Sequence, residues 1–141
     1  MAYDFPSPEW AASCKDAINA NPAYKTAGKD WTHGVVAMVV KADANLRIPE
    51  DTGLWLDVHQ GTCRECKFVS AAEVQEAAFI LIADHARWKQ VIKKELDPIK
   101  GMMQGKLKLI KGHMPTIVKY VNASRELVES TSRVATQFRD D

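Results

Sequence analysis

The sequence predicts an α+β fold, in which a curved, mostly antiparallel sheet of five strands carries helices on one face. Three observations favour this fold class. Apolar residues recur at helical spacing near both ends of the chain. The middle of the chain holds short valine-rich or alternating segments, which are typical of strands. No crossover helix separates the first four strand segments, which favours antiparallel pairing. The length favours one domain, residues 1–141.

Two helices are predicted before the sheet. Ser7-Pro8-Glu9 places a capping side chain, a proline and an acid in the order that helix starts favour. Asn21-Pro22 ends this first helix, because proline cannot continue it. A short helix over 23–27 follows, and Gly28 ends it.

Four strand segments come next, separated by turn residues. The first is apolar on both faces, as in a central strand. The Gln60-Gly61 pair predicts a tight hairpin between the second and third segments. The four segments are 34–41, 53–59, 63–69 and the end of 73–83.

Two capped helices are predicted after these strands. Asp84 is expected to cap the first of them. Its apolar face carries Trp88, Val91, Ile92 and Leu96. Asp97-Pro98 repeats the cap-and-proline signal and opens a short helix through Met102-Met103, which Gly105 ends.

A fifth strand is predicted over 106–111. Alternation places Lys106 and Lys108 on the solvent face and Leu107 and Leu109 on the inward face. A long final helix is then predicted over about 115–138, from its apolar stripe. This helix either closes the core or covers a cavity.

Positive charge is concentrated in one segment of the chain. Residues 86–119 carry 9 Lys/Arg and 2 Asp/Glu, whereas residues 1–85 carry 7 and 12. Such a segment forms either a solvated face or a surface for anionic head groups or phosphates. Nucleic acid is not expected as a partner, because the sequence pI is about 7.7 and aromatic residues do not interleave the basic segment.

Cysteine usage and hydropathy predict a cytoplasmic location. The chain has three cysteines, an odd number that favours a reducing compartment. The N-terminus lacks the features of a signal peptide. The longest apolar run, Val35–Val40, is far shorter than a membrane span.

The most metal-like spacing is that of His59, Cys63 and Cys66. Zinc requires four ligands, or three and a water, and no second Cys-x-x-Cys pair is present. If Cys63 and Cys66 share one strand, alternation puts them on opposite faces and forbids joint ligation. A metal site, a redox disulfide and ordinary thiols remain as alternatives, and no metal site is predicted.

Catalytic motifs are weak. Asp84 and His85 are adjacent, so they do not face each other on a helix, and Asp84 already has a capping role. His33 and His113 have no evident partners in the sequence. No glycine-rich phosphate loop or nucleophile elbow is present. Neither a catalytic residue nor a cofactor is therefore predicted.

The segment 97–115 resembles the sterol carrier protein type 2 (SCP-2) family of lipid-transfer domains. Family members have a proline-opened short helix with bulky apolar residues, a strand of Gln-Gly-Lys-Leu-Lys type, then a glycine, a polar residue and a methionine. The matching residues are Asp97-Pro98, Met102-Met103, Gln104 to Lys108, Gly112 and His113-Met114. The chain ends Arg139-Asp140-Asp141 instead of in a Ser-Lys-Leu-type signal, which points to a prokaryotic-type member.

This resemblance implies a sheet and helices that enclose an apolar tunnel for fatty acid, fatty acyl-CoA, sterol or other lipids. Methionines near such a tunnel suit varied apolar partners, although they also serve simply as core filling. The residues expected at the lipid site are Met102, Met103, Gln104, Leu107, Leu109, Met114, Ile117, Phe79 and Trp88.

The leading functional hypothesis is non-catalytic binding and transfer of lipids, with weak contact to anionic membranes. One alternative is an enzyme, or an accessory domain of one, that holds an apolar substrate in the same cavity. In that case a buried ionisable residue such as His33 or His59 would face the tunnel. A second alternative is a structural interaction module, which a filled core would favour. The sequence does not predict the oligomeric state.

Overall fold

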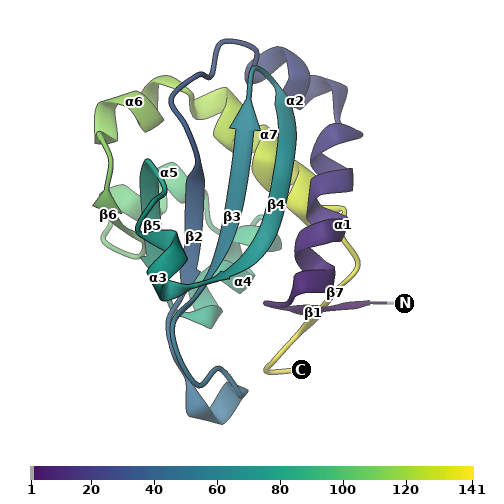
Figure 1. The fold of residues 1–141 in the computed structure, drawn as a ribbon, viewed down its shortest axis with the longest axis vertical. Coiled ribbons are helices and arrows are strands. Elements are labelled where there is room, and N and C mark those ends of the chain that lie inside the picture. The colour runs from purple at the N-terminus through teal and green to yellow at the C-terminus, as the bar shows by residue number, and fades with distance from the viewer. Residues whose placement is uncertain (1) are drawn as a thin grey trace.

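The structure of residues 2–141 is a computed structural model, and its centre is a five-stranded sheet (Figure 1). The strands lie in the order β4-β3-β2-β5-β6. Their bounds are β2 (Val36–Val40), β3 (Thr52–His59), β4 (Thr62–Ser70), β5 (Phe79–Ala83) and β6 (Lys108–Lys111). The predicted α+β class and the predicted sheet of five strands are confirmed.

Helices cover mainly one face of this sheet, with α4 and α7 behind it in the view of Figure 1. The helices are α1 (Pro8–Asn19), α2 (Pro22–Ala27), α3 (Ala71–Val74), α4 (His85–Ile92), α5 (Pro98–Met103), α6 (Met114–Lys119) and α7 (Val121–Ser132). The short α3 is the exception, because its Val74 packs on the opposite face of the sheet. A 3-10 turn (Ala44–Leu46) occupies the predicted turn after β2.

Three of the four strand pairings are antiparallel. These are β2 with β3, β3 with β4, and β5 with β6. The fourth is parallel, since β5 runs beside β2 with Val36 opposite Phe79. The mostly antiparallel prediction therefore holds, and the sheet is mixed. The β3–β4 hairpin and α3 together form the connection that returns the chain to β2, a role that a crossover helix often has.

Alternation along the strands divides the sheet into two faces. Val36, Met38 and Val40 of β2 face the helices and join the main core. Ala37 and Val39 face the other side, in a smaller cluster that α3 covers. A cavity bounded by the sheet must therefore lie on the helix side.

Several predicted boundaries are confirmed by their caps. Ser7 caps α1 by accepting a hydrogen bond from the Trp10 N–H at 3.1 Å. Asp84 and Asp97 accept in the same way from the first turns of α4 and α5. Gln60 and Gly61 have φ of 50° and 83°, the left-handed conformations that the predicted hairpin needs.

The expectation that Cys63 and Cys66 face opposite sides is wrong. In β4, Cys66 pairs with Leu56 and Cys63 pairs with Val58, although only one residue separates Leu56 from Val58. A β-bulge in this region adds a residue to β4 and reverses the alternation. Both thiols consequently face the helix-covered core.

The predicted helix over about 115–138 is also wrong in two places. Tyr120, with φ −99° and ψ 38°, separates α6 from α7. The second helix then ends at Ser132, and Thr136–Phe138 forms β7, which pairs in parallel with β1 (Tyr3–Phe5). The apolar stripe runs through both breaks, so periodicity alone does not reveal them.

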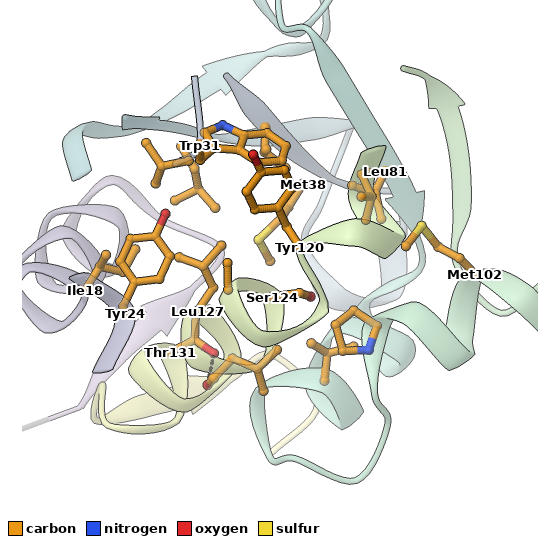
Figure 2. A pocket seen from close by; sticks show the side chains of 18 of the residues that line it. Ile18, Tyr24, Trp31, Met38, Leu81, Met102, Tyr120, Ser124, Leu127 and Thr131 are labelled. Carbon is orange, nitrogen blue, oxygen red and sulfur yellow. Dashed lines mark hydrogen bonds between the residues drawn. The ribbon is translucent and has the colours of Figure 1, made fainter. Parts of the chain in front are cut away.

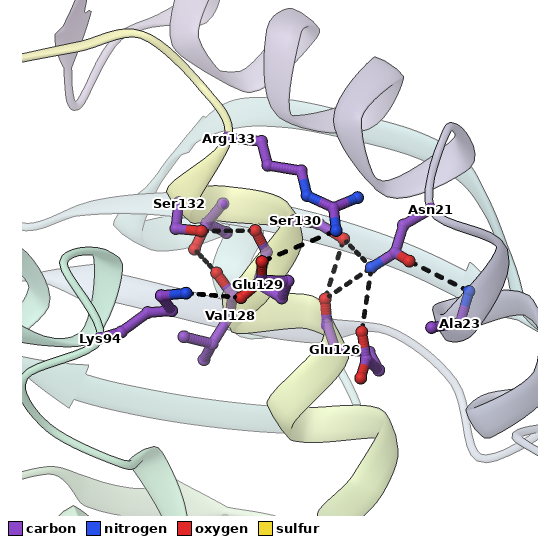
Figure 3. Close-up of polar contacts among 10 residues, drawn as sticks. Asn21, Ala23, Lys94, Glu126, Val128, Glu129, Ser130, Ser132 and Arg133 are labelled. Atoms are coloured by element: carbon purple, nitrogen blue, oxygen red, sulfur yellow. Dashed lines mark hydrogen bonds and ion pairs between the residues drawn. The ribbon is translucent and has the colours of Figure 1, made fainter.

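Serine and threonine side chains explain the early end of α7 (Figure 3). Ser130, Thr131 and Ser132 donate hydrogen bonds to main-chain carbonyls of their own helix at 2.6–2.9 Å. Such bonds compete with the helical backbone pattern. The strand-forming segment after Ser132 then leaves the helix axis.

Two smaller boundaries differ from prediction. Lys94 has φ 64°, so α4 ends before Leu96, which is buried but not helical. The fifth strand begins at Lys108 instead of at 106. Lys106 and Lys108 are exposed as predicted, and Leu107 is buried.

The C-terminal residues 136–141 are fastened to the body of the protein and are called here the C-terminal clasp. Arg139 binds Asp4 at 3.0 Å and the carbonyls of Pro6 and Arg47 at 2.7 and 2.8 Å. Its backbone N–H donates to Nε2 of His85 at 3.3 Å. His85 is buried between Phe5 and Phe138.

Acid is expected to weaken the fold through His85. Burial lowers the pKa of His85; Lys89 and Arg139 add to this, while Asp140 and Asp141 oppose it. The unfolded chain therefore takes up a proton below pH of about 6.5, where the folded chain does not, and the free energy of unfolding falls. Denaturant titrations between pH 7.5 and 5 measure this slope.

A His85→Phe variant supplies the comparison, since phenylalanine keeps a ring between Phe5 and Phe138 but does not titrate. We expect a flatter pH dependence in this variant. An equal slope in the wild type and in His85→Phe would contradict the assignment to His85.

Candidate functional site

An apolar cavity of about 110 Å³ lies between the sheet and the helices that cover it (Figure 2). All five of α1, α2, α4, α5 and α7 contribute to its wall, together with three central strands and α6. The lining residues are Ile18, Tyr24, Trp31, Val36, Met38, Leu56, Val58, Leu81, Trp88, Val91, Pro98, Met102, Ile117, Tyr120, Ala123, Ser124, Leu127, Val128 and Thr131.

The sheet side of the cavity follows from strand alternation. Val36 and Met38 come from β2, Leu56 and Val58 from β3, and Leu81 from β5. Within β2 and within β3, the two lining residues are two positions apart, so one face of the pleat supplies the whole wall. Because the side chains on this face are apolar, the sheet side of the cavity offers no polar contacts.

The helix side follows from helical periodicity. The α7 residues at the cavity recur at spacings of three and four, which places them on one stripe of the helix. They are Ala123, Ser124, Leu127, Val128 and Thr131. Ala123, the smallest of these side chains, lies at the start of the stripe, in the first turn of α7. The prediction that the final segment either closes the core or covers a cavity is thus resolved in favour of a cavity.

Aromatic rings form the wall near the junction of α6 and α7. Trp31 and Tyr120 lie with their ring centroids 5.0 Å apart, and both line the cavity. His33 lies 5.0 Å from Trp31 on the solvent side and does not reach the cavity. The Tyr120 hydroxyl donates to the carbonyl of Asp30 at 3.1 Å, which ties the junction to the loop before β2.

Three of the nine residues predicted for the lipid site line the cavity: Trp88, Met102 and Ile117. The side chain of Trp88 is fixed because its Nε1–H donates to the Val39 carbonyl at 2.8 Å. Met102 and Ile117 reach the cavity from the short helices α5 and α6.

The other six predicted residues lie outside this cavity. Met103 is 68% exposed, and Gln104 is exposed beside it. Leu107 is fully buried against Gly101. Leu109 and Met114 are half-buried against the main core, and Phe79 packs on Trp31 with ring centroids 5.3 Å apart. Contact between these six residues and a ligand stays a prediction.

Sequence reasoning missed most of the wall. Tyr24 and Trp31 were not singled out, and no motif marks them. The inward residues of β2 and β3 were identified only as strand interior, since core and cavity positions have the same pattern. Leu127 and Val128 belong to the predicted stripe, but alternation and periodicity do not tell filled space from empty space.

Ionisable groups are nearly excluded from the cavity. Among residues 2–141, its only titratable lining residues are two tyrosines, Tyr24 and Tyr120. His33 is exposed and His59 half-buried, and neither lines it. The two histidines of the enzyme alternative are therefore absent from the described wall, and Tyr24 is the buried ionisable side chain that lies there.

The thiols lie in the core as ordinary buried side chains. Cys14, Cys63 and Cys66 are free and buried. Burial raises the pKa of Cys63 to about 12, with a smaller contribution from Cys66. The neighbouring Cys14, together with burial, raises the pKa of Cys66. Protonated thiols are poor nucleophiles and poor ligands. Residues 2–141 contain no group of three or more potential metal ligands.

The basic segment lies mostly at the surface. Lys100, Lys106 and Lys108 are exposed, and none of them has an acidic partner within residues 2–141. Lys89 is different, because it pairs with Asp140 and Asp141 of the C-terminal clasp at 2.8 and 3.1 Å. Across residues 2–141, none of the helices is both long and apolar enough to cross a membrane.

Comparison with known proteins gives one family. The SCP-2 sterol transfer family matches residues 14–124. A crystal structure of sterol carrier protein 2 is 33% identical, with a TM-score of 0.84, over 92% of this chain and 98% of that one. The solution structure of a conserved hypothetical protein from Thermus thermophilus, a suggested sterol carrier protein, is 32% identical over 93% and 90%, again with a TM-score of 0.84.

A more distant structure shares the fold alone. The UbiJ-SCP2 ubiquinone synthesis protein is 18% identical over 84% of this chain and 87% of that one, with a TM-score of 0.53. The sequence comparison with curated proteins found no match.

The family match spans most of the chain and includes the segment 97–115 that carried the resemblance. Two solved structures above 30% identity cover more than nine-tenths of the chain with the same fold. The chain belongs to the SCP-2 sterol transfer family.

Proposed function

We propose that this protein binds lipids in its apolar cavity and transfers them, without catalysing a reaction. The observation that carries this proposal is the cavity itself, which is enclosed by carbon-rich side chains and has no charged group in its described wall. Fatty acid, fatty acyl-CoA and sterol-like lipids are the candidate ligands. Trp88, Met102 and Ile117 are the predicted site residues that would touch a bound chain.

Burial of hydrocarbon supplies the binding energy in this proposal. Each methylene removed from water contributes about 0.8 kcal/mol. A volume of about 110 Å³ is smaller than the roughly 300–1,000 Å³ of ordinary ligand sites. The cavity therefore has to widen for a long chain, and the closed structure holds only part of one.

The α6 side of the cavity is the part best suited to open. No residue of α6 is fully buried, and His113 at its start makes no capping hydrogen bond through its side chain. The second half of α7 is held more firmly. Asn21 donates to the carbonyl of Glu126 at 3.3 Å, and Lys94 pairs with Glu129 at 2.8 Å (Figure 3).

Opening on this side would also bring the remaining predicted residues toward the ligand. Met114 belongs to α6, and Leu109 and Phe79 lie on the neighbouring strands β6 and β5. Met103 is the last residue of α5, and Gln104 and Leu107 lie between α5 and β6. We propose contact with these six residues only in the widened state.

The exposed lysines of the basic segment support a weak attraction to anionic membranes. Each basic residue near such a surface contributes about 1 kcal/mol, and salt screens the effect. The buried, unpaired state of the three thiols supports the predicted cytoplasmic location.

Chain-length dependence tests the proposal. Saturated fatty acids of about 8, 10, 12 and 14 carbons are used to displace a fluorescent fatty acid. Their affinity is expected to rise about tenfold with each added pair of methylenes, because both are buried. The rate at which the protein moves the fluorescent fatty acid between vesicles tests the proposed transfer activity. Binding that is absent at micromolar concentrations, or independent of chain length, would contradict it.

A further inference from the structure

Tyr24 is one of four hydroxyl-bearing side chains at the wall of the cavity, with Tyr120, Ser124 and Thr131. Tyr24 belongs to α2 and is 1% exposed to solvent. It lines the cavity, and Figure 2 shows its ring among the lining side chains with the hydroxyl directed toward the sheet. Pro22 and the Asn21 cap fix the start of this short helix and thereby the position of the ring.

The Tyr24 hydroxyl has no hydrogen-bond partner among residues 2–141. The other tyrosine of the cavity, Tyr120, donates to a carbonyl at 3.1 Å. The nearby Cys63 thiol is not free to serve Tyr24 as a donor, because it donates to the carbonyl of Glu65 at 3.4 Å. Buried hydroxyls are nearly always hydrogen-bonded to protein or to water, so the Tyr24 hydroxyl is left for water or a ligand.

The ring cannot easily turn away to find a partner. A Cβ atom at Gly28 would lie 2.9 Å from Cζ of Tyr24 and 3.1 Å from its hydroxyl oxygen. The tip of the ring therefore fits only because residue 28 has no side chain. The close fit holds the tip of the ring against Gly28, at the end of α2.

The side chains around the Tyr24 hydroxyl favour an uncharged ligand atom over a charged one. No lysine, arginine or histidine lines the cavity within residues 2–141. Burial raises the pKa of Tyr24 above its usual range, and Cys63 adds to the rise, as expected where water and cations are distant. A carboxylate placed here would be a buried charge without a partner, which is strongly unfavourable.

We propose that Tyr24 hydrogen-bonds an uncharged oxygen of the bound lipid, a hydroxyl or a carbonyl, and so orients the lipid with that oxygen inside the cavity. This inference rests on the proposed lipid-binding function and narrows the ligand class to neutral oxygen-bearing lipids. An ionised fatty acid would bind only in the opposite orientation, with its carboxylate in solvent.

The test compares ligands of equal length on the wild type and on Tyr24→Phe, by displacement of a fluorescent probe at pH 8. The ligands are 1-decanol, 2-decanone, decanoate and decane. Tyr24→Phe keeps the ring, and we expect it to lower the affinity for decanol or decanone about fivefold to tenfold. Decane and decanoate should keep their affinities.

The two oxygen ligands distinguish the source of the hydrogen bond. If Tyr24→Phe loses affinity for decanone alone, Tyr24 bonds a carbonyl oxygen. If it loses affinity for decanol as well, Tyr24 bonds either a carbonyl or a hydroxyl oxygen. Tyr3→Phe, at an exposed tyrosine outside the cavity, is the matched control and should change no affinity. Thermal unfolding of both variants checks that the fold is intact.

The outcomes separate this inference from the function on which it rests. Failure of all four ligands to bind the wild type would contradict lipid binding itself. Binding of all four with no selective loss in Tyr24→Phe would overturn the role of Tyr24 and leave lipid binding in place. Selective weakening of decanoate would overturn the neutral-ligand assignment.

Discussion

Replacing Ala123 with phenylalanine is expected to reduce the affinity for a fluorescent fatty acid at least about a hundredfold, the equivalent of losing three to four buried methylenes. Ala123 is 6% exposed and faces the cavity from the first turn of α7. A benzyl group added at this position has no other space to enter. It would occupy the volume of about 110 Å³ that the ligand needs.

The cost to folding should be much smaller than the loss of binding. Enlarging a side chain in a well-packed core costs about 1–3 kcal/mol, and part of this is recovered where an existing void is filled. Asn122→Phe is the matched control, because Asn122 is exposed on the same helix and does not line the cavity. Unchanged affinity in Ala123→Phe with an intact fold would mean that the ligand binds elsewhere.

The largest loss of stability is expected from Trp10→Ala, at about 3–5 kcal/mol. Trp10 is fully buried in α1, and its ring lies 4.8 Å from that of Phe5 in an edge-on contact. Its Nε1–H donates to the Thr136 hydroxyl at 2.9 Å. One side chain therefore supports both β1 and β7, which are the two ends of the chain.

Denaturant unfolding measures the total effect of this substitution, and hydrogen exchange locates it. We expect faster exchange at the Tyr3 N–H, which donates to the Ala135 carbonyl at 2.8 Å. Trp10→Phe retains most of the buried area and should lose less. Trp55→Ala, at a half-buried tryptophan on the other face of the sheet, is the control. Equal losses from Trp10→Ala and Trp55→Ala would contradict the role given to Trp10.

Local signals predicted the fold where a residue acts on its own neighbours. Ser7, Asp84 and Asp97 cap helices because their side chains reach N–H groups two or three residues away. The Gln60-Gly61 turn has the same local character. These features made the predicted order of the main elements correct from α1 to β6, whereas β1 and the short α3 were not predicted.

Features that depend on distant contacts were not predictable in this way. The bulge in β4 is defined by its pairing with β3, so the common face of Cys63 and Cys66 could not be read from their spacing. The strand β7 exists because β1, at the opposite end of the chain, lies beside it. Tyr120, at the break between α6 and α7, packs its ring on that of Trp31, a contact between residues far apart in the sequence.

The lipid site was predictable only in part for a related reason. The resemblance over 97–115 led to Met102, because it concerns the segment around α5, whereas Ile117 belongs to the apolar stripe of the predicted final helix. Val91 and Leu127 satisfy the same apolar patterns as core residues, and only the three-dimensional arrangement leaves a void beside them. A cavity is a property of packing, and sequence periodicity carries no information on packing density.

Methionine methyl groups offer the most direct test of the central claim, that a lipid chain enters this cavity. Met38 and Met102 line it, whereas Met103 is exposed. In protein labelled with ¹³C at the methionine methyls, a bound decanol should give intermolecular NOEs to Met38 and Met102. The account predicts these contacts in the closed cavity, and NOEs at Met103 in addition only where the ligand widens it. NOEs confined to Met103, or shifts that leave Met38 and Met102 unchanged, would contradict it.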